Sequence, residues 1–254
     1  MKILEEIPLE LKKIKTPPKN IFYRGNPSLL EKPKVAIVGS RKMLNYTRML
    51  VHELSSKLSR AGIIVVSGAA LGVDATAHRA SGSNTIAVMP TSLDIIYPKT
   101  NKEMIENIFE NALAISEYSV GTKSNKYSFI ERNRLVTAIS DAVVIAQADI
   151  SSGSMHSARW ALEQGKELFV LPQRLGESSG TNMLLSSGEA QLIDNIDSFV
   201  KRFGFLDENP NDELLQWCAS NSDYEEAYRR FGEQLLEYEL DGKIRIENAQ
   251  IILL

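Results

Sequence analysis

The segment IIVVSGAALGVDATAH, residues 63–78, contains the features from which the fold can be predicted. It opens with an apolar, β-branched run typical of a buried strand, turns at Gly68, and continues as a helical pattern near 73–81. The segment VAIVG at 35–39 is a second apolar run that ends in glycine, and leucines at helical spacing follow it. Each segment therefore predicts a strand that ends in a glycine-containing turn and leads into a helix.

The same pattern continues along the chain to residue 171. Further strands are predicted at 85–89, 113–116, 142–146 and 168–171, and further helices near 101–109, 128–139 and 155–164. Strands that are apolar throughout are covered on both faces, so they indicate a parallel sheet between two layers of helices. The predicted fold class is α/β, with a doubly wound, Rossmann-like, mostly parallel sheet. Ligands of such sheets bind beyond the carboxyl ends of the strands.

We expect three parts in the chain. Residues 1–34 form an N-terminal leader packed on a Rossmann-like domain at 35–204, and residues 205–254 form a small acidic domain. The three short helical patterns and the hairpin of the acidic domain resemble a winged-helix domain of α(+β) type. This domain has 12 acidic and 4 basic residues, whereas residues 1–204 have 20 acidic and 25 basic ones. The two parts are therefore expected to face different partners.

The composition is that of a soluble globular protein. Apolar residues make up 43% of the 254 residues and charged residues 24%, which excludes intrinsic disorder. No apolar run approaches the roughly 20 residues of a membrane span, and the N-terminus lacks the layout of a secretory signal. The one cysteine, Cys218, excludes a disulfide framework and a cysteine-based zinc site. The three histidines show no metal spacing, so we expect no metal site. Because the chain shows neither a membrane span nor a secretory signal, we expect a cytoplasmic protein without a membrane contact.

Three loops after predicted strands combine glycine with small polar residues. They contain Gly39-Ser40-Arg41, the run from Ser67 to Asp74, and the run from Ser151 to Ser154. Glycine lets the backbone approach a ligand, and the free N–H groups of a helix start favour anions. Three such loops at one sheet edge predict a phosphate-binding floor, with Arg41 as a cationic contact. The alternative is that they are only tight βα turns.

Two common phosphate motifs are absent from the chain. No G-x-G-x-x-G turn follows the first predicted strand, and the chain has no G-x-x-x-x-G-K-[ST] motif. A dinucleotide or ATP site of those types is therefore excluded, and no cofactor is expected.

The segment KYSFIERNR at 126–134 places an aromatic residue among cations. This arrangement suits stacking of Phe129 on an exposed base while Lys126 and the arginines neutralise the backbone phosphates. The alternative makes Phe129 a core residue, so both interpretations stay open at this point.

The same alternative assigns structural roles to the charged side chains. Arg132 and Arg134 are then helix-surface residues, and at least one of them is ion-paired to Glu131 or Asp141. His78, on the helix after Gly72, is interpreted as a packed or solvent-facing helix residue, because nothing in the sequence assigns it a role as a base.

The chain resembles the DNA-processing protein A (DprA/Smf) family from about residue 8 to residue 203. The motifs that carry the resemblance are PPKNIFYRG, VAIVGSR, VVSGAALGVDATAH, SLDIIYP, FIERNRLVTAIS, SGSMHSARWALEQGKELFVLP and GTNMLLSSG. The resemblance implies a non-enzymatic protein that binds single-stranded DNA entering the cell during natural transformation, protects it and loads the RecA recombinase onto it. It also implies a homodimer formed through the Rossmann-like domain.

The resemblance also implies a set of DNA-binding residues. By motif they are Ser40, Arg41, Ser67, Gly68, Lys126, Phe129, Arg132, Asn133, Arg134, Gly153 and Ser154. The arginines and the asparagine belong to the family's RNR motif, and Gly153 and Ser154 to its SGS motif, where the roles are as much structural as DNA-contacting. The chain departs from the family at Leu71, where members often have an arginine, and this removes a phosphate contact.

An enzyme of the lysine-decarboxylase-like Rossmann group is the alternative function. Those proteins hydrolyse nucleoside monophosphates with the glutamate of a P-G-G-x-G-T-x-x-E motif. The matching place here reads SSGSMHSA at 151–158 and has no carboxylate in the glutamate position, so we expect no enzymatic activity. A reader of double-stranded DNA in the acidic C-terminal part is a third interpretation, and the charge of that part opposes it.

Overall fold

The computed structural model describes residues 1–125, 127–204, 213–240 and 243–253 of the chain. The chain divides into two compact units, Met1–Leu206 and Asp207–Leu254. Within the described residues, no helix has the length and apolar character needed to cross a membrane.

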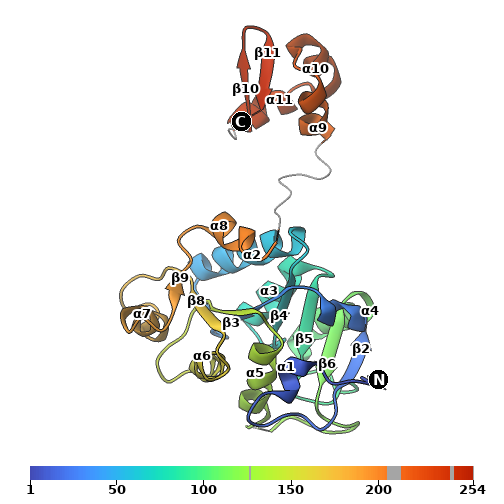
Figure 1. Ribbon diagram of the computed structural model, residues 1–254, viewed down its shortest axis with the longest axis vertical. Coiled ribbons are helices and arrows are strands. Elements are labelled where there is room, and N and C mark those ends of the chain that lie inside the picture. The colour runs from blue at the N-terminus through green and yellow to red at the C-terminus, as the bar shows by residue number, and fades with distance from the viewer. Residues whose placement is uncertain (126, 205–212, 241–242, 254) are drawn as a thin grey trace. The chain divides into compact units, whose positions relative to one another are not determined.

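A mostly parallel sheet forms the centre of the first unit (Figure 1). Its six parallel central strands are β3 (Lys34–Val38), β4 (Ile64–Ser67), β5 (Thr85–Val88), β6 (Leu113–Ser116), β7 (Ala142–Ile145) and β8 (Glu167–Val170). Their order across the sheet is β6-β5-β4-β3-β7-β8, so the chain winds outward in both directions from β3. All six strands were predicted from their continuous apolar runs, and the predicted α/β, Rossmann-like fold class is confirmed.

Three further strands were not predicted. Strand β2 (Phe22–Gly25) pairs antiparallel with β6, and β1 (Lys2–Ile3) extends the sheet beyond it, while β9 (Gln191–Leu192) adds the opposite edge. The leader, which was expected to pack on the Rossmann-like domain, therefore contributes two strands to its sheet. Strands of two to four residues at a sheet edge lack the continuous apolar run by which buried strands are recognised.

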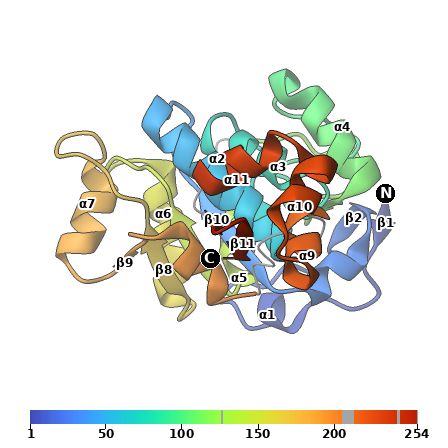
Figure 2. The ribbon, with the colours of Figure 1, turned by 90° about the horizontal axis from the view of Figure 1, so that it is seen from above.

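Helices cover both faces of the sheet. One face carries α2 (Asn45–Arg60), α3 (Val73–Ser81), α4 (Lys102–Asn111), which packs beside α3, and α8 (Ile196–Lys201). The other carries α1 (Leu9–Lys12), α5 (Ser128–Ala138), α6 (Gly153–Glu163) and α7 (Ser179–Ser186). Short 3-10 turns occupy Pro27–Glu31 and Lys99–Asn101. In Figures 1 and 2, β8, β9 and α7 lie at one end of the sheet, and β2 and α4 lie at the other.

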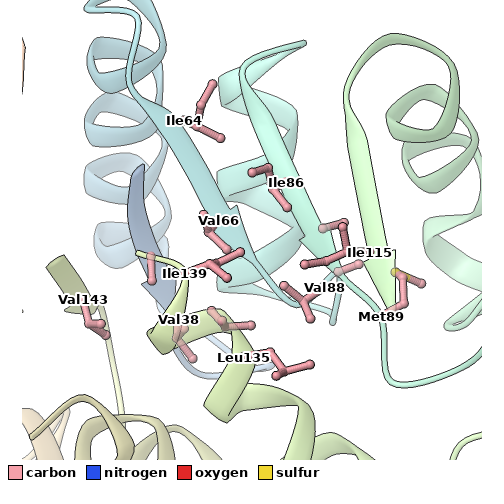
Figure 3. Close-up of a cluster of buried hydrophobic side chains, with 14 of the residues drawn as sticks. Val38, Ile64, Val66, Ile86, Val88, Met89, Ile115, Leu135, Ile139 and Val143 are labelled. Atoms are coloured by element: carbon pink, nitrogen blue, oxygen red, sulfur yellow. The ribbon is translucent and has the colours of Figure 1, made fainter. Parts of the chain in front are cut away.

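The strands divide their side chains between the two layers by simple alternation. Val35 and Ile37 of β3 belong to the core under α2 and α3, whereas Ala36 and Val38 belong to the core under α5. Figure 3 shows the second core, in which Leu135 of α5 packs among apolar side chains of several strands. Burial on both faces explains why these strands read as unbroken apolar runs.

The second unit has three short helices and a hairpin, as the sequence predicted. They are α9 (Glu213–Ser220), α10 (Tyr224–Phe231), α11 (Gln234–Leu240), β10 (Ile244–Glu247) and β11 (Gln250–Leu253). Asn248 and Ala249 form the hairpin turn with positive φ angles. A small core around Leu214, Leu235 and Ile251 joins the elements, and Cys218 is buried in it.

Candidate functional site

A groove of about 520 Å³ opens at the carboxyl ends of β3 and β7. The loops after these strands, the loop from β4 into α3, and the first turns of α5 and α6 line it. The lining residues are Val38, Gly39, Ser40, Arg41, Ala70, Asp74, Phe129, Ile130, Arg132, Asn133, Ser152, Gly153 and Ser154. Seven of the eleven residues assigned to DNA binding from the sequence therefore meet in one place, at the sheet edge where the topology predicts a ligand site.

Arg41 lies at the tip of the turn after β3 and is exposed. The hydroxyl of Ser40 accepts a hydrogen bond from the backbone N–H of Lys42 (3.1 Å) and donates one to its carbonyl oxygen (2.9 Å), which closes the turn. The backbone N–H of Ser40 donates to the carbonyl oxygen of Gln147 in the loop after β7 (2.9 Å). The turn thus presents the guanidinium of Arg41 at the groove from a fixed base.

Phe129 contacts both Arg41 and a second aromatic side chain, Tyr97. The guanidinium carbon of Arg41 lies 5.0 Å from the centre of the Phe129 ring, within the range of a cation–π contact. On the same ring, Tyr97 makes a tilted contact with centroids 5.5 Å apart. A smaller cavity next to the groove is lined by Arg41, Gly68, Ala70, Leu71, Pro90, Tyr97, Pro98 and Phe129. Phe129 is half-buried and lies outside the hydrophobic cores of the described residues.

Tyr97 was not among the residues predicted for the site. It is 41% exposed and follows the loop after β5, which brings it to the same sheet edge as Phe129. Its only signal in the sequence was the motif SLDIIYP, to which no function had been assigned.

Arg132 is buried beneath the groove. Its guanidinium donates to the carbonyl oxygens of Gly68 and Val88, and its Nε donates to Oδ1 of Asn133 (3.0 Å). Burial lowers the pKa of Arg132 to about 10, so the side chain stays charged at neutral pH. Burial raises the pKa of Asp74, and the nearby charge of Arg132 acts in the opposite direction. Both side chains are buried at the groove, and Nε and Nη1 of Arg132 donate to groups within the protein.

The glycines after β3 and β4 face protein groups. A Cβ atom on Gly68 would lie 2.3 Å from the guanidinium carbon of Arg132, and one on Gly72 would lie 2.3 Å from the carbonyl oxygen of Ser40. A Cβ on Gly39 would meet the side chain of Val73 at 2.7 Å. Glycine is required at these three positions because protein groups occupy the space where a Cβ atom would lie. This agrees with the interpretation of the loops as tight βα turns. Gly153 differs, because it is exposed and nothing lies within 4 Å of its Cβ position.

The start of α6 forms one wall of the groove. Ser152 precedes the helix, and its buried hydroxyl has no hydrogen-bond partner within the described residues. Gly153 and Ser154 are the first two residues of this eleven-residue helix. Unpaired N–H groups and the partial positive charge of a helix start attract anions. Arg41 and the start of α6 together make this groove suitable for phosphate.

Ser67 and His78 are buried behind the groove. The Ser67 hydroxyl donates to the carbonyl oxygen of Ile37 (2.7 Å), so Ser67 does not reach the groove surface. Nε2 of His78 accepts from the backbone N–H of Ala69 (3.2 Å), and its Nδ1 lies 2.7 Å from Oγ1 of Thr85. Burial lowers the pKa of His78 to about 3, which keeps the ring neutral. His78 is thus a packed helix residue.

Arg134 is not among the residues that line the groove, and its hydrogen bonds run to other parts of the protein. Its guanidinium forms two hydrogen bonds of 2.7 Å with the carboxylate of Glu117, and its Nε donates to the carbonyl oxygen of Thr16 in the leader (3.0 Å). The expected ion pair therefore exists, but Glu117 replaces the expected partners. Asp141 instead accepts from the backbone N–H of Lys34 (2.7 Å).

Lys126 lies outside the described residues, and its predicted role stays a prediction. The residues on either side are described. Oδ1 of Asn125 accepts from the N–H groups of Tyr127 (2.8 Å) and Ser128 (3.0 Å), which forms the turn that starts α5.

Across the described ranges of the chain, no three His, Cys, Asp or Glu side chains are grouped so that they could hold a metal ion.

Comparison with protein families identifies the first unit. The family of the DNA recombination-mediator protein A matches residues 3–204, which include every residue of the groove. The chain belongs to this family. The expected resemblance to DprA/Smf proteins is confirmed.

Individual DprA proteins are similar over the same region. DNA processing protein DprA of Streptococcus pneumoniae is 36% identical over 203 residues, covering 78% of this chain and 71% of that protein. DprA of Bacillus subtilis is 35% identical over 175 residues, covering 67% of this chain and 59% of that protein. Against several relatives, the match therefore spans little more than half of the relative's length.

Solved structures of DprA proteins have the same fold. A structure of DNA processing protein A from Helicobacter pylori, described for its single-stranded DNA binding mode, is 47% identical with a TM-score of 0.78. The match covers 79% of this chain and 94% of the Helicobacter pylori chain. The X-ray structure of DprA from Streptococcus pneumoniae is 36% identical with a TM-score of 0.73, covering 78% of this chain and 71% of that chain.

Proposed function

We propose that this chain binds single-stranded DNA in the groove and acts as a non-enzymatic mediator of recombination. The contact between Arg41 and Phe129 next to the start of α6 carries this proposal. Single strands expose both base faces and phosphates, so they are bound by aromatic side chains interleaved with cations. The ring of Phe129 offers a surface for a base, while Arg41 and the N–H groups of Gly153 and Ser154 attract the adjoining phosphates.

The family supports the same function. The Helicobacter pylori protein, whose structure is described for single-stranded DNA binding, is also 47% identical to this chain. We infer that the chain protects single strands that enter the cell during natural transformation and loads RecA onto them. Its place of action is then the cytoplasm. RecA loading is tested by following RecA assembly on single-stranded DNA by light scattering, with and without the chain. An unchanged assembly rate would contradict this part of the proposal.

A homodimer completes the proposal. Strand β9 is an edge of the sheet, and Leu192 on it is 45% exposed. Leu162 of α6 and Met183 of α7 are also exposed. Exposed apolar side chains beside a free strand edge favour association. We therefore place the dimer contact on this edge of the first unit, and light scattering of Leu162→Ser and Leu192→Ser variants tests it.

The alternative function, hydrolysis of nucleoside monophosphates, has less support. Asp74 is the one carboxylate among the lining residues of the groove, and it is buried. Its Oδ2 lies 3.3 Å from the backbone N–H of Ala70, and it faces the charge of Arg132. A carboxylate held in this way is a structural partner. Release of ribose from AMP by the purified chain would favour the enzyme.

The test of DNA binding compares single-stranded and double-stranded oligonucleotides across salt concentrations. We expect tighter binding of the single strand, and Arg41→Ala should weaken it. Loss of one phosphate contact should reduce the slope of log affinity against log salt by about 0.7. Lys13→Ala, an exposed cation of the leader, is the matched control and should leave both quantities unchanged. An Arg41→Ala variant with unchanged affinity and slope would place the DNA elsewhere.

A further inference from the structure

The loop after β8 lies directly beside the loop after β7 that lines the groove. The backbone N–H of Ala148 donates to Oγ of Ser178 (2.9 Å), and the N–H of Gly180 donates to the carbonyl oxygen of Ala148 (2.8 Å). One residue pair further on, the N–H of Ile150 donates to Oγ of Ser179 (3.3 Å). These bonds join the two loops at the same sheet edge as the groove.

Side chains also fasten the base of the β8 loop. Nε2 of Gln173 donates to the carbonyl oxygen of Ala146 (2.8 Å) and to Oγ1 of Thr47 on α2 (3.1 Å). Nδ2 of Asn182 donates to the carbonyl oxygen of Arg174 (3.2 Å). These hydrogen bonds fix the conformation of the loop, so the side chains at its tip are exposed to solvent in a defined position.

Three side chains on these loops are unusually exposed. The side chain of Arg174 is 78% exposed, Leu175 is 96% exposed, and Ile150 is 54% exposed. We call Ile150, Arg174 and Leu175 the loop strip. It combines one cation and two apolar side chains on two hydrogen-bonded loops, one of which also reaches the groove at Ser152.

The sheet order decides where the loop strip lies in a dimer. The groove is at β3 and β7, the loop strip follows β8, and the exposed apolar edge is β9. Figures 1 and 2 show β8 and β9 together at one end of the sheet. In a dimer joined at the β9 edge with both grooves on the same side, the loop after β8 lies between each groove and the dimer contact, so a strand that runs from one groove to the other passes it.

We propose that the loop strip contacts a single DNA strand on its way between the two grooves of the dimer. Arg174 would bind a phosphate, and Leu175 and Ile150 would contact the apolar faces of bases. Two carboxylates belong to the same loops. Glu177 forms an ion pair of 3.7 Å with Arg174, and Asp149 is exposed on the neighbouring loop, so a phosphate must compete with Glu177 for the guanidinium. This inference rests on the proposed function.

The test uses the full chain and two lengths of single-stranded DNA. An oligonucleotide of about 6 nucleotides occupies one groove only, whereas one of about 40 nucleotides spans both grooves of a dimer. The variants are Arg174→Ala and Leu175→Ser. Lys13→Ala and Leu9→Ser are matched controls, since they remove an exposed lysine and an exposed leucine of the leader. Fluorescence anisotropy gives the affinities, and light scattering gives the oligomeric state.

We expect both variants to bind the short oligonucleotide like the unaltered chain and the long one about fivefold to tenfold more weakly, because the strand between the grooves loses a contact. Arg174→Ala should also lower the salt slope for the long oligonucleotide by about 0.7. Equal weakening on both lengths, no weakening on the long one, or loss of the dimer in the variants would overturn the inference. If the unaltered chain binds neither oligonucleotide, the proposed function itself is wrong.

Discussion

The guanidinium of Arg132 packs directly against the Cα atom of Gly68. A Cβ atom at position 68 would lie 2.3 Å from the guanidinium carbon, closer than any side chain tolerates. The same guanidinium binds the carbonyl oxygens of Gly68 and Val88, so it ties the ends of β4 and β5 together. The glycine is required by the arginine beneath the groove, and a ligand is not needed to explain it.

Gly68→Ala is therefore expected to destabilise the fold. Arg132 must move to make room, and this overpacking should lower the free energy of unfolding by about 1–3 kcal/mol. Urea unfolding measures the change. Gly153→Ala is the control and should change the free energy by no more than about 0.5 kcal/mol, because its Cβ position is open. Equal stability of the two variants would show that Arg132 can move away from residue 68 without a cost in free energy.

Phe129→Ala separates a base contact from a core contact. Because Phe129 is half-buried at the groove, its loss should weaken binding of single-stranded DNA by about 1–3 kcal/mol with little change in unfolding. Phe109→Ala provides the contrast, since Phe109 is a buried core residue of α4 and its loss should cost about 3–5 kcal/mol of stability. A Phe129 variant that unfolds easily yet binds DNA normally would assign the ring to the core.

The ion pair between Arg134 and Glu117 predicts that a variant lacking only the arginine is less stable than a variant lacking both charges. Arg134→Met leaves the Glu117 carboxylate without its partner in a largely buried place, and we expect a loss of about 3–5 kcal/mol in unfolding free energy. Arg134→Met combined with Glu117→Leu removes both charges and should recover part of this loss. The salt slope of DNA binding should not change in either variant. A double variant less stable than the single one would contradict this account.

Because His78 is buried and neutral, we expect the free energy of unfolding to decrease in acid. Its folded pKa of about 3 lies below its ordinary value of 6.5, so below pH 6.5 the unfolded chain takes up a proton that the folded chain does not. The free energy of unfolding therefore falls as the pH drops from about 6.5 toward 3, and between pH 7 and pH 5 the loss from His78 is about 2 kcal/mol. Replacing His78 by Gln removes this contribution. Denaturant unfolding at both pH values should show a smaller decrease for His78→Gln, and an equal decrease would mean that the ring is protonated in the fold.

The acidic second unit is expected not to bind DNA. Its arginines are used in ion pairs, Arg229 with Glu225, Arg230 with Glu213 and Arg245 with Glu247. A chain that ends at Gly204 should therefore keep its affinity for single-stranded DNA within about twofold at physiological salt. A gel shift of duplex DNA by an isolated 205–254 fragment at micromolar concentration would contradict this.

The sequence predicted the central strands because burial on both faces leaves an unbroken apolar run. It also predicted that the loops after β3 and β7 meet, because parallel strands bring their carboxyl ends to one edge. The directions of Arg132 and Arg134 could not be predicted. Residues two apart on a helix point about 200° away from each other, and the carbonyl groups and the carboxylate that receive these side chains are distant in sequence.

The pairing of β2 with β6 has a consequence for the order in which the chain is made. Phe22 lies opposite Ser116 and Gly25 lies opposite Leu113, so β2, whose other neighbour is the two-residue strand β1, joins the main sheet only after β6 has been synthesised. Chains fold from their N-terminus during synthesis only as far as partners are present. The first 25 residues are therefore placed late, and removing them would leave β6 as an open edge on a finished sheet.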